Sequence, residues 1–121
     1  MIEFKRHNFK KLKIWQKGME LTKIILDITD TFPVAEKFGL KSQMDRCSIS
    51  MPSNVAEGSS RTDKSFSHFI DISLGSSFEL QTQLLLANHR KYITNEGTTE
   101  IEIKIEEFQR ATMSFQNTLN K

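Results

Sequence analysis

Residues 9–33 read FKKLKIWQKGMELTKIILDITDTFP, and this stretch decides the fold class. Its apolar and small residues recur in alternating steps of four and three, and a second stripe lies beside the first. The first stripe is Ile14, Gly18, Leu21, Ile25, Ile28 and Phe32, and the second is Leu12, Trp15, Met19 and Leu26. This spacing predicts a helix of about five to six turns within residues 9–32, with a wide apolar face. Pro33 ends the helix, because the residue before a proline is pushed out of the helical region.

The same periodicity returns in a second predicted helix that starts near residue 40. Its stripe is Leu40, Met44, Cys47, Met51 and Val55, and Ser42 is its candidate N-cap. Pro52 lies inside this helix and lacks the amide hydrogen that would bond the Ser48 carbonyl, so we expect a kink there. Residues 58–60, Gly-Ser-Ser, predict the end of the helix.

Two further helices complete the pattern. The third begins at Thr62 or Asp63, with the stripe Phe66, Ile70, Ser73, Ser77, Leu80, Leu84 and Ala87. The fourth begins at Thr98 or Thr99, after a break at residues 95–97, with the stripe Ile101, Ile105, Phe108, Thr112, Phe115 and Leu119. Small residues surround Leu74 in the third helix. Because a glycine inside a helix costs about 1 kcal/mol relative to alanine, we expect another backbone to pack closely against Gly75.

Four amphipathic helices with short connections predict an all-α fold, an up-down-up-down antiparallel four-helix bundle. The 121 residues fit a single domain, 1–121, in which residues 1–8 form a loosely ordered N-terminal segment. The apolar surface is wider than one bundle core requires, so we expect a homo-oligomer. Its aromatic members on the predicted helices are Trp15, Phe66, Phe69 and Phe78.

Composition and motifs exclude several classes of protein. No apolar run approaches the roughly 18 residues that cross a membrane, and no signal-peptide core follows the basic N-terminus. With one cysteine, Cys47, the chain forms no internal disulfide. A cytoplasmic location follows. P-loop, GxSxG, dinucleotide-binding and di-iron patterns are missing, so we expect no catalytic residue, no metal and no cofactor.

The positive charge is concentrated near the N-terminus. The net charge is +2, yet residues 1–20 hold six cations and two anions. A basic surface of this kind attracts RNA or DNA through counterion release. The candidate nucleic-acid contacts are Lys10, Lys11, Lys13, Lys17 and Arg46. The alternative is an ordinary solvated helix face.

A second candidate site lies at the end of the second helix. Asn54, Glu57, Gly58 and Arg61 share one helix face, and Glu57 precedes Arg61 by the four residues that favour an ion pair. Glu79 of the third helix is the fifth member, since it is able to pair with Arg61 or with Arg46. These residues form either a buried hydrogen-bonded cluster that holds the turn into the third helix or a binding surface.

Four stretches of the sequence together resemble one protein family. They are residues 9–21, residues 32–40 (FPVAEKFGL), residues 43–61 with the run Pro-Ser-Asn-Val-Ala-Glu-Gly, and residues 73–84. Over roughly residues 9–92 the chain resembles the 23S rRNA-intervening sequence proteins. The resemblance implies a small antiparallel bundle that assembles into a ring-like homopentamer. It also implies a link to the basic accessory variability determinant proteins of diversity-generating retroelements, which bind nucleic acid. The family has no assigned catalytic residues.

Two functional hypotheses follow. The leading one is a non-enzymatic homo-oligomeric bundle that acts as an accessory or scaffold protein and binds RNA or DNA weakly through its basic N-terminal face. The alternative is a protein–protein adaptor without nucleic-acid affinity. Asp45 stands where the family usually has a basic or neutral residue, which favours weak over tight binding of nucleic acid. Salt dependence separates the two hypotheses, since each phosphate contact steepens the loss of affinity with salt.

Overall fold

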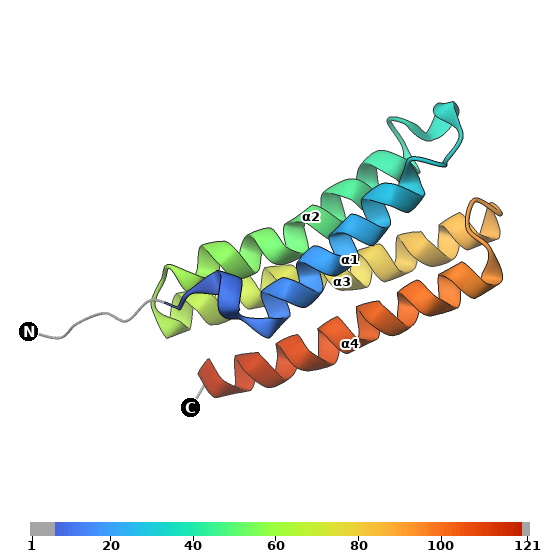
Figure 1. The fold of residues 1–121 in the computed structure, drawn as a ribbon. Coiled ribbons are helices and arrows are strands. Elements are labelled where there is room, and N and C mark those ends of the chain that lie inside the picture. Colours follow the sequence, from blue (N-terminus) through green and yellow to red (C-terminus); the bar gives the residue numbers. More distant parts are fainter. Residues whose placement is uncertain (1–6, 120–121) are drawn as a thin grey trace, which may run out of the picture.

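A computed structural model describes residues 7–119, and over that range the chain contains four α-helices, two short 3₁₀ helices and no strand. The expected all-α four-helix bundle is confirmed (Figure 1). The elements in chain order are η1 (Phe9–Lys11), α1 (Lys13–Thr29), η2 (Val34–Glu36), α2 (Leu40–Ser59), α3 (Asp63–His89) and α4 (Asn95–Leu119). No helix among the described residues is sufficiently long and apolar to cross a membrane.

Two residues of the expected loose N-terminal segment, His7 and Asn8, make defined contacts with the rest of the chain. Residues 1–6 of the expected loose segment lie outside the described residues, but His7 donates its backbone amide to the Ser59 carbonyl at 3.3 Å. The side chain of Asn8 accepts the Lys10 amide at 3.2 Å and caps η1. A 3₁₀ turn precedes the first predicted helix: α1 begins at Lys13 after an extended Leu12, and it ends at Thr29 rather than at Phe32.

The helix starts follow local capping chemistry, which differs in part from the prediction. Thr62 caps α3 as expected, because its side chain accepts the Ser65 amide at 3.3 Å. Ser42 does not cap α2, which begins at Leu40, whose amide donates to the Glu36 carboxylate at 3.2 Å. Thr98 and Thr99 do not start α4. That helix begins at Asn95, and the preceding Thr94 hydroxyl accepts the Gly97 amide at 3.0 Å.

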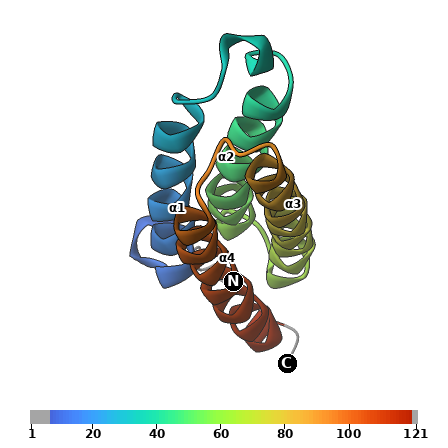
Figure 2. The same ribbon diagram turned by 90° about the vertical axis from the view of Figure 1, so that its right-hand side faces the viewer.

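The core follows the predicted stripes and divides into two clusters. One cluster lies toward the α1–α2 connection and is built around Leu21, Met51, Leu84 and Phe108. The other lies toward the N-terminus and is centred on Phe66 and residues packed around it. Figure 2 shows the four helices end on, with α2 next to both α1 and α3. The apolar faces of the helices thus meet in an interior made of these two clusters.

Pro52 is buried inside α2 and leaves a backbone acceptor free. The Ser48 carbonyl would bond to the missing amide of residue 52, and it accepts instead from the Thr22 hydroxyl of α1 at 2.7 Å. The same hydroxyl lies 2.8 Å from the Gly18 carbonyl. Gly18 faces the proline, and a Cβ there would lie 3.4 Å from Pro52. Thr22 and Gly18 thereby fit α1 to the proline-containing turn of α2.

The close contact expected at Gly75 is wrong within the subunit. A Cβ on Gly75 would meet no atom within 4 Å, and the residue is exposed. The reason is helix geometry. Ser73 and Ser77 are buried, and a residue two positions from each of them points to the opposite side of α3. The close approach occurs at Gly58 instead, where a Cβ would lie 2.6 Å from the Phe66 ring and 2.8 Å from Phe69 Cβ.

Candidate interaction surfaces

The five residues of the predicted second-helix cluster do not form one hydrogen-bonded group. Glu57 and Arg61 do pair, at 3.3 Å, but their side chains are 56% and 52% exposed. Asn54 turns back along its own helix and donates to the Ser50 carbonyl at 2.8 Å and to the Ser50 hydroxyl at 2.9 Å. Glu79 lies elsewhere and accepts from the Cys47 thiol at 3.4 Å. The expectation of a buried polar cluster is therefore wrong.

Packing holds the turn between α2 and α3. Gly58 is buried against Phe66 and Phe69, and the Arg61 guanidinium lies 5.5 Å from the centre of the Phe69 ring. The Arg61 amide donates to the Gly58 carbonyl at 2.9 Å, which closes the turn. Of the predicted cluster, Gly58 has a demonstrable structural role, whereas the Glu57–Arg61 pair lies on the surface and contributes little to stability.

Ser50 and Cys47 connect α2 to α3 in ways that the sequence did not reveal. The hydroxyls of Ser50 and Ser76 lie 2.9 Å apart, so the Asn54 side chain extends a polar contact between the two helices. Cys47 lies between Glu79 and the Gln83 amide, which donates to its sulfur at 3.5 Å. Burial raises the pKa of the Cys47 thiol above its ordinary value, and the Glu79 carboxylate adds to that shift. The thiol is therefore a weak nucleophile.

The candidate nucleic-acid contacts do not form one surface. Lys10, Lys11 and Lys13 are exposed at the end of the bundle where the N-terminal segment lies against the end of α2. Arg46 lies 13 residues before Ser59 on the same helix, which is about 20 Å away at the rise of an α-helix. It therefore belongs to a different part of the surface.

Two cations that sequence reasoning did not include extend the basic end. Arg61 and Lys64 flank the α2–α3 turn and are exposed. The His7 imidazole lies 3.8 Å from the Asp63 carboxylate, so the N-terminal segment and the start of α3 meet at this end. We define the basic end as Lys10, Lys11, Lys13, Arg61 and Lys64. Only the fold brings these residues together, because the two segments are about 50 residues apart in the sequence.

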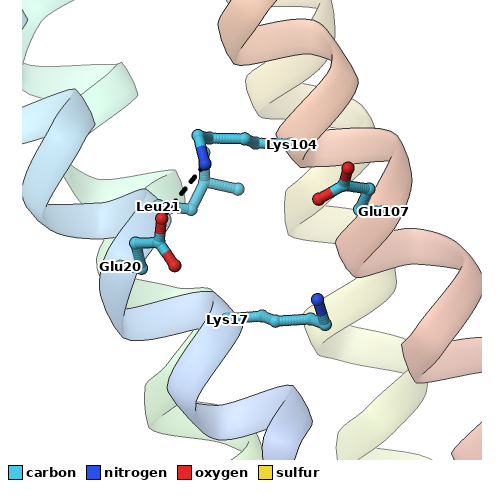
Figure 3. A pocket seen from close by; sticks show the side chains of 5 residues that line it. All are labelled: Lys17, Glu20, Leu21, Lys104 and Glu107. Carbon is cyan, nitrogen blue, oxygen red and sulfur yellow. Dashed lines mark hydrogen bonds and ion pairs between the residues drawn. The ribbon is translucent and has the colours of Figure 1, made fainter.

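Lys17 faces a charged seam between α1 and α4. Figure 3 shows Lys17 and Glu20 of α1 and Lys104 and Glu107 of α4 around a small opening, with Leu21 at its base. The Lys104 ammonium lies 3.1 Å from the Glu20 carboxylate. The opening measures about 30 Å³, which is too small for an organic ligand. The charges around the opening alternate in sign, so α1 and α4 attract each other there. The α4 helix carries five carboxylates and two cations.

Asp45 belongs to a structural ion-pair network. Its carboxylate accepts the Thr29 hydroxyl and lies 2.9 Å from the Lys41 ammonium, which also pairs with Asp30 at 3.0 Å. These two carboxylates raise the pKa of Lys41 above its ordinary value. The negative charge of Asp45 is thus paired where α1 meets α2, about 20 Å from the basic end.

An apolar strip runs along the outer side of α3. Five residues define this α3 face, namely Ile72, Gly75, Phe78, Leu85 and Leu86, and its four apolar side chains are 40–52% exposed. Ile49 of α2 is exposed as well. Glu79 lies among these residues, seven positions before Leu86 and therefore on the same side of the helix. The face is broad and apolar with few charges, as is typical of a surface that binds protein.

The connection between α1 and α2 carries the most exposed apolar side chains among the described residues. Val34 and Phe38, which we call the apolar tip, are each 89% exposed. The Glu36 side chain anchors this connection to the rest of the bundle, because its carboxylate accepts a hydrogen bond from the Tyr92 hydroxyl at 2.8 Å and another from the Leu40 amide. Both hydrogen bonds lower the pKa of Glu36, and the hydrogen bond to the Glu36 carboxylate raises the pKa of Tyr92.

The described residues show no site for a metal. Over residues 7–119, no three His, Cys, Asp or Glu side chains gather closely enough to hold an ion. The largest grooves are open and shallow, such as the one over Trp15, Met19 and Ile24 on the outer side of α1. The features that stand out are therefore surfaces: the basic end, the α3 face and the apolar tip.

Comparisons with known proteins place the chain in a family. A crystal structure of a protein of unknown function from the S23 ribosomal protein family of Bacteroides thetaiotaomicron is similar to it, with a TM-score of 0.79 at 21% identity. The match covers 85% of this chain and 97% of that one, and at this identity it shows the shared fold alone. No curated protein matches the sequence. The sequence model for the 23S rRNA-intervening sequence protein matches residues 10–114, nearly the whole chain, and the chain therefore belongs to the 23S rRNA-intervening sequence protein family.

Proposed function

We propose that the protein is a self-associating scaffold, an antiparallel up-down-up-down bundle without catalytic activity whose copies meet through the α3 face. A ring-like homopentamer is the assembly that the family resemblance favours. The supporting observation is the apolar strip of Ile72, Phe78, Leu85 and Leu86 along one helix. A lone bundle gains nothing from leaving four large apolar side chains on one side of a helix, since each loses hydrophobic stabilisation in water.

Gly75 supports the same surface. It lies in the middle of a 27-residue helix, where glycine lowers helix stability by about 1 kcal/mol relative to alanine. No atom of its own subunit lies within 4 Å of the Cβ position, so packing inside the subunit does not require a glycine there. A helix from another copy that crosses α3 at this point would make use of the missing side chain. Both the apolar residues and the glycine are explained by one contact.

Sedimentation velocity over a micromolar concentration range tests the proposal. The wild-type chain should sediment as a multiple of 14.0 kDa. Leu86→Glu should shift the distribution toward the monomer, because it places a charge in the apolar contact. Ile103→Glu on α4 is the matched control, since Ile103 is 49% and Leu86 is 52% exposed. A wild-type mass of one chain at all concentrations contradicts the proposal, and so does equal dissociation of both variants.

A second candidate function is weak RNA or DNA binding at the basic end. The observation that favours it is the meeting of five cations from two distant segments, beside the carboxylates of Glu57 and Asp63. Trp15, the only tryptophan, stacks edge-on against Phe9 at 5.3 Å beside these lysines. Bases of a single strand commonly stack on aromatic side chains next to cations. The protein–protein adaptor without nucleic-acid affinity is the competing possibility.

Fluorescence anisotropy with a labelled single-stranded RNA separates these possibilities. Affinity at the basic end should fall as salt rises, with a log–log slope of about −0.7 for each phosphate contact. Lys10→Gln combined with Lys64→Gln should make that slope shallower by the amount that corresponds to the loss of roughly one to two phosphate contacts. Lys91→Gln, a charge change at an exposed residue between α3 and α4 and away from the basic end, is the control. Affinity that does not depend on salt, or is equal in all variants, excludes the basic end as the binding surface.

A further inference from the structure

We propose that self-association is head to tail: the apolar tip of one copy docks on the C-terminal part of the α3 face of a second copy. The contact joins Val34 and Phe38 of one subunit to Leu85 and Leu86 of the next. This inference rests on the self-association proposed above and specifies which two surfaces meet. It differs from a two-fold contact, in which the α3 face of one copy would pack on the same face of the other.

The first argument is that a single copy leaves two different apolar surfaces in water, the apolar tip and the α3 face. A symmetric contact between two α3 faces would cover Ile72 and Leu86 but would leave Val34 and Phe38 in water. These two residues are 89% exposed, more than any residue of the α3 face. A head-to-tail contact covers the apolar tip and the C-terminal part of the α3 face at once, because each copy supplies one of each. The occupant of the tip is then a second copy of the same chain.

The second argument is that the tip is held rigidly. Tyr92 donates its hydroxyl to Glu36 at 2.8 Å, and its ring lies 5.2 Å from the Phe32 ring, which is buried. Three backbone hydrogen bonds of 2.9–3.0 Å, donated by residues 36, 37 and 39, close the turns of the connection. A surface that is fixed before binding loses little conformational freedom on docking. Such anchoring of a solvent-facing loop suits a docking element.

Charge is the third argument. The Lys37 ammonium lies 5.4 Å from the centre of the Phe38 ring and has no ion-pair partner among the described residues. The other lysine of this region, Lys41, is paired with two carboxylates. The α3 face offers Glu79, whose contact inside the subunit is the neutral Cys47 thiol. Docking the tip near Leu86 would bring Lys37 of one copy toward Glu79 of the next, two helical turns away on the same side of α3.

The position of the two surfaces in the bundle is the fourth argument. Tyr92 follows α3 directly and contacts Phe32 and Glu36, so the apolar tip and the C-terminal part of α3 lie at the same end of the bundle. Figure 2 shows the α1–α2 connection rising above the ends of α3 and α4. A rotation that relates neighbouring copies keeps this end on one side of the assembly. The tip and the α3 face are therefore able to meet repeatedly around a closed ring.

Disulfide trapping between two variants tests the contact. Cys47 is the only cysteine, so each variant carries Cys47→Ser and one new cysteine, Phe38→Cys or Leu86→Cys. The two variants, mixed in a redox buffer, should form cross-linked dimers at least about tenfold faster than either alone, because an interface holds two thiols at millimolar effective concentration. The control mixture pairs the Phe38→Cys variant with one that carries Cys47→Ser and Ile103→Cys, and it should cross-link slowly.

The outcomes separate this inference from the proposed self-association. Rapid cross-linking of the Leu86→Cys variant alone would show a symmetric α3 contact, and rapid cross-linking of the Phe38→Cys variant alone would show contact between tips. Either result overturns the head-to-tail contact and leaves self-association intact. Sedimentation of Phe38→Asp adds a second measurement: dissociation to monomers is expected, whereas a wild-type mass overturns the inference. A monomeric wild-type chain removes the underlying proposal itself.

Discussion

Gly58 and Gly75 lie on neighbouring helices and have opposite surroundings. A Cβ at Gly58 would overlap the Phe66 ring at 2.6 Å, whereas a Cβ at Gly75 would meet nothing within 4 Å. Gly58 belongs to the inner side of the α2–α3 pair, where backbone and rings approach closely. Gly75 belongs to the outer side, where no neighbouring helix of the subunit packs against it. The inner side builds the bundle, and the outer side is available for other copies.

The comparison extends from the glycines to their surroundings. The inner side pairs buried polar groups across helices, as the Thr22 hydroxyl does for the Ser48 carbonyl, although the buried Gln83 Oε1 and Thr112 Oγ1 have no hydrogen-bond partner among the described residues. The outer side leaves apolar side chains in water along α3 and at the apolar tip. Substitutions on the inner side should therefore change the stability of the fold, and substitutions on the outer side should change association.

The largest expected effect is that of Gly58→Ala. The added methyl overlaps Phe66 and Phe69 Cβ, so unfolding should become easier by about 3 kcal/mol, at the upper end of overpacking costs. Gly75→Ala is the matched control and should stabilise an isolated subunit by about 0.5–1 kcal/mol through helix propensity. Urea denaturation of both variants measures the difference. Equal effects would show that the two glycines do not differ as described.

Thr22→Val should have the next largest effect. Valine has the shape of threonine but leaves the Ser48 carbonyl without a donor in the interior, which should cost about 1–3 kcal/mol. Thr22→Ser keeps the hydroxyl and is the control, with a smaller loss from the missing methyl. Thermal and urea unfolding compare the two variants. If valine is tolerated as well as serine, the Thr22 hydrogen bond does not compensate for Pro52.

The sequence predicts most of the fold because the interior has a simple period. Ile25, Met51, Leu80 and Ile105 are all fully buried, as their stripes require. The helix starts were less predictable because several neighbouring side chains are able to cap a helix, and the apolar spacing does not show which one reaches the first free amides. Leu40 begins α2 through the carboxylate of Glu36 in the preceding turn, a bond that periodicity does not reveal.

The candidate sites were predicted less well than the fold. Spacing places Glu57 and Arg61 correctly as a pair, but periodicity along one helix does not tell whether the shared face is buried. Lys64 joins the basic end only through the fold, since it comes about 50 residues after Lys13 in the chain. The sequence shows that Gly75 is an unusual residue for the middle of a helix, but it does not show which side of α3 this glycine faces.

Arg61→Ala should have a small effect on stability. Its pair with Glu57 is half exposed, so the free energy of unfolding should fall by less than about 1 kcal/mol. A loss of about 3 kcal/mol or more, as for a broken buried pair, would contradict the exposed geometry. If Arg61 contributes to the basic end, the same variant should weaken RNA binding at low salt. Denaturation and anisotropy measurements on one preparation resolve the two effects.

The smallest expected effect concerns the hydrogen bond that anchors the apolar tip. Glu36 lowers its own pKa by accepting from Tyr92 and Leu40, so its contribution to stability is present at neutral pH and is lost as acid takes the pH down through that lowered pKa. Tyr92 shows the reverse: its pKa is raised above 10.0, so the contact is retained below that pH and is lost as the pH rises through the raised value. The hydrogen bond between Glu36 and Tyr92 therefore anchors the tip at any pH between the lowered pKa of Glu36 and the raised pKa of Tyr92.

Spectroscopic titration of Tyr92 measures this anchor directly, because the chain contains one tyrosine. Glu36→Gln retains an acceptor for the hydroxyl but removes the charge, so the pKa of Tyr92 should move down toward its ordinary value. The control is Glu107→Gln, since Glu107 lies on the α1–α4 seam and does not act on Tyr92. An unchanged titration midpoint in Glu36→Gln would show that the carboxylate does not hold the hydroxyl. The tip would then lose its side-chain anchor and would be held only by its backbone turns and by the contact of Tyr92 with Phe32, which weakens its role as a rigid docking element.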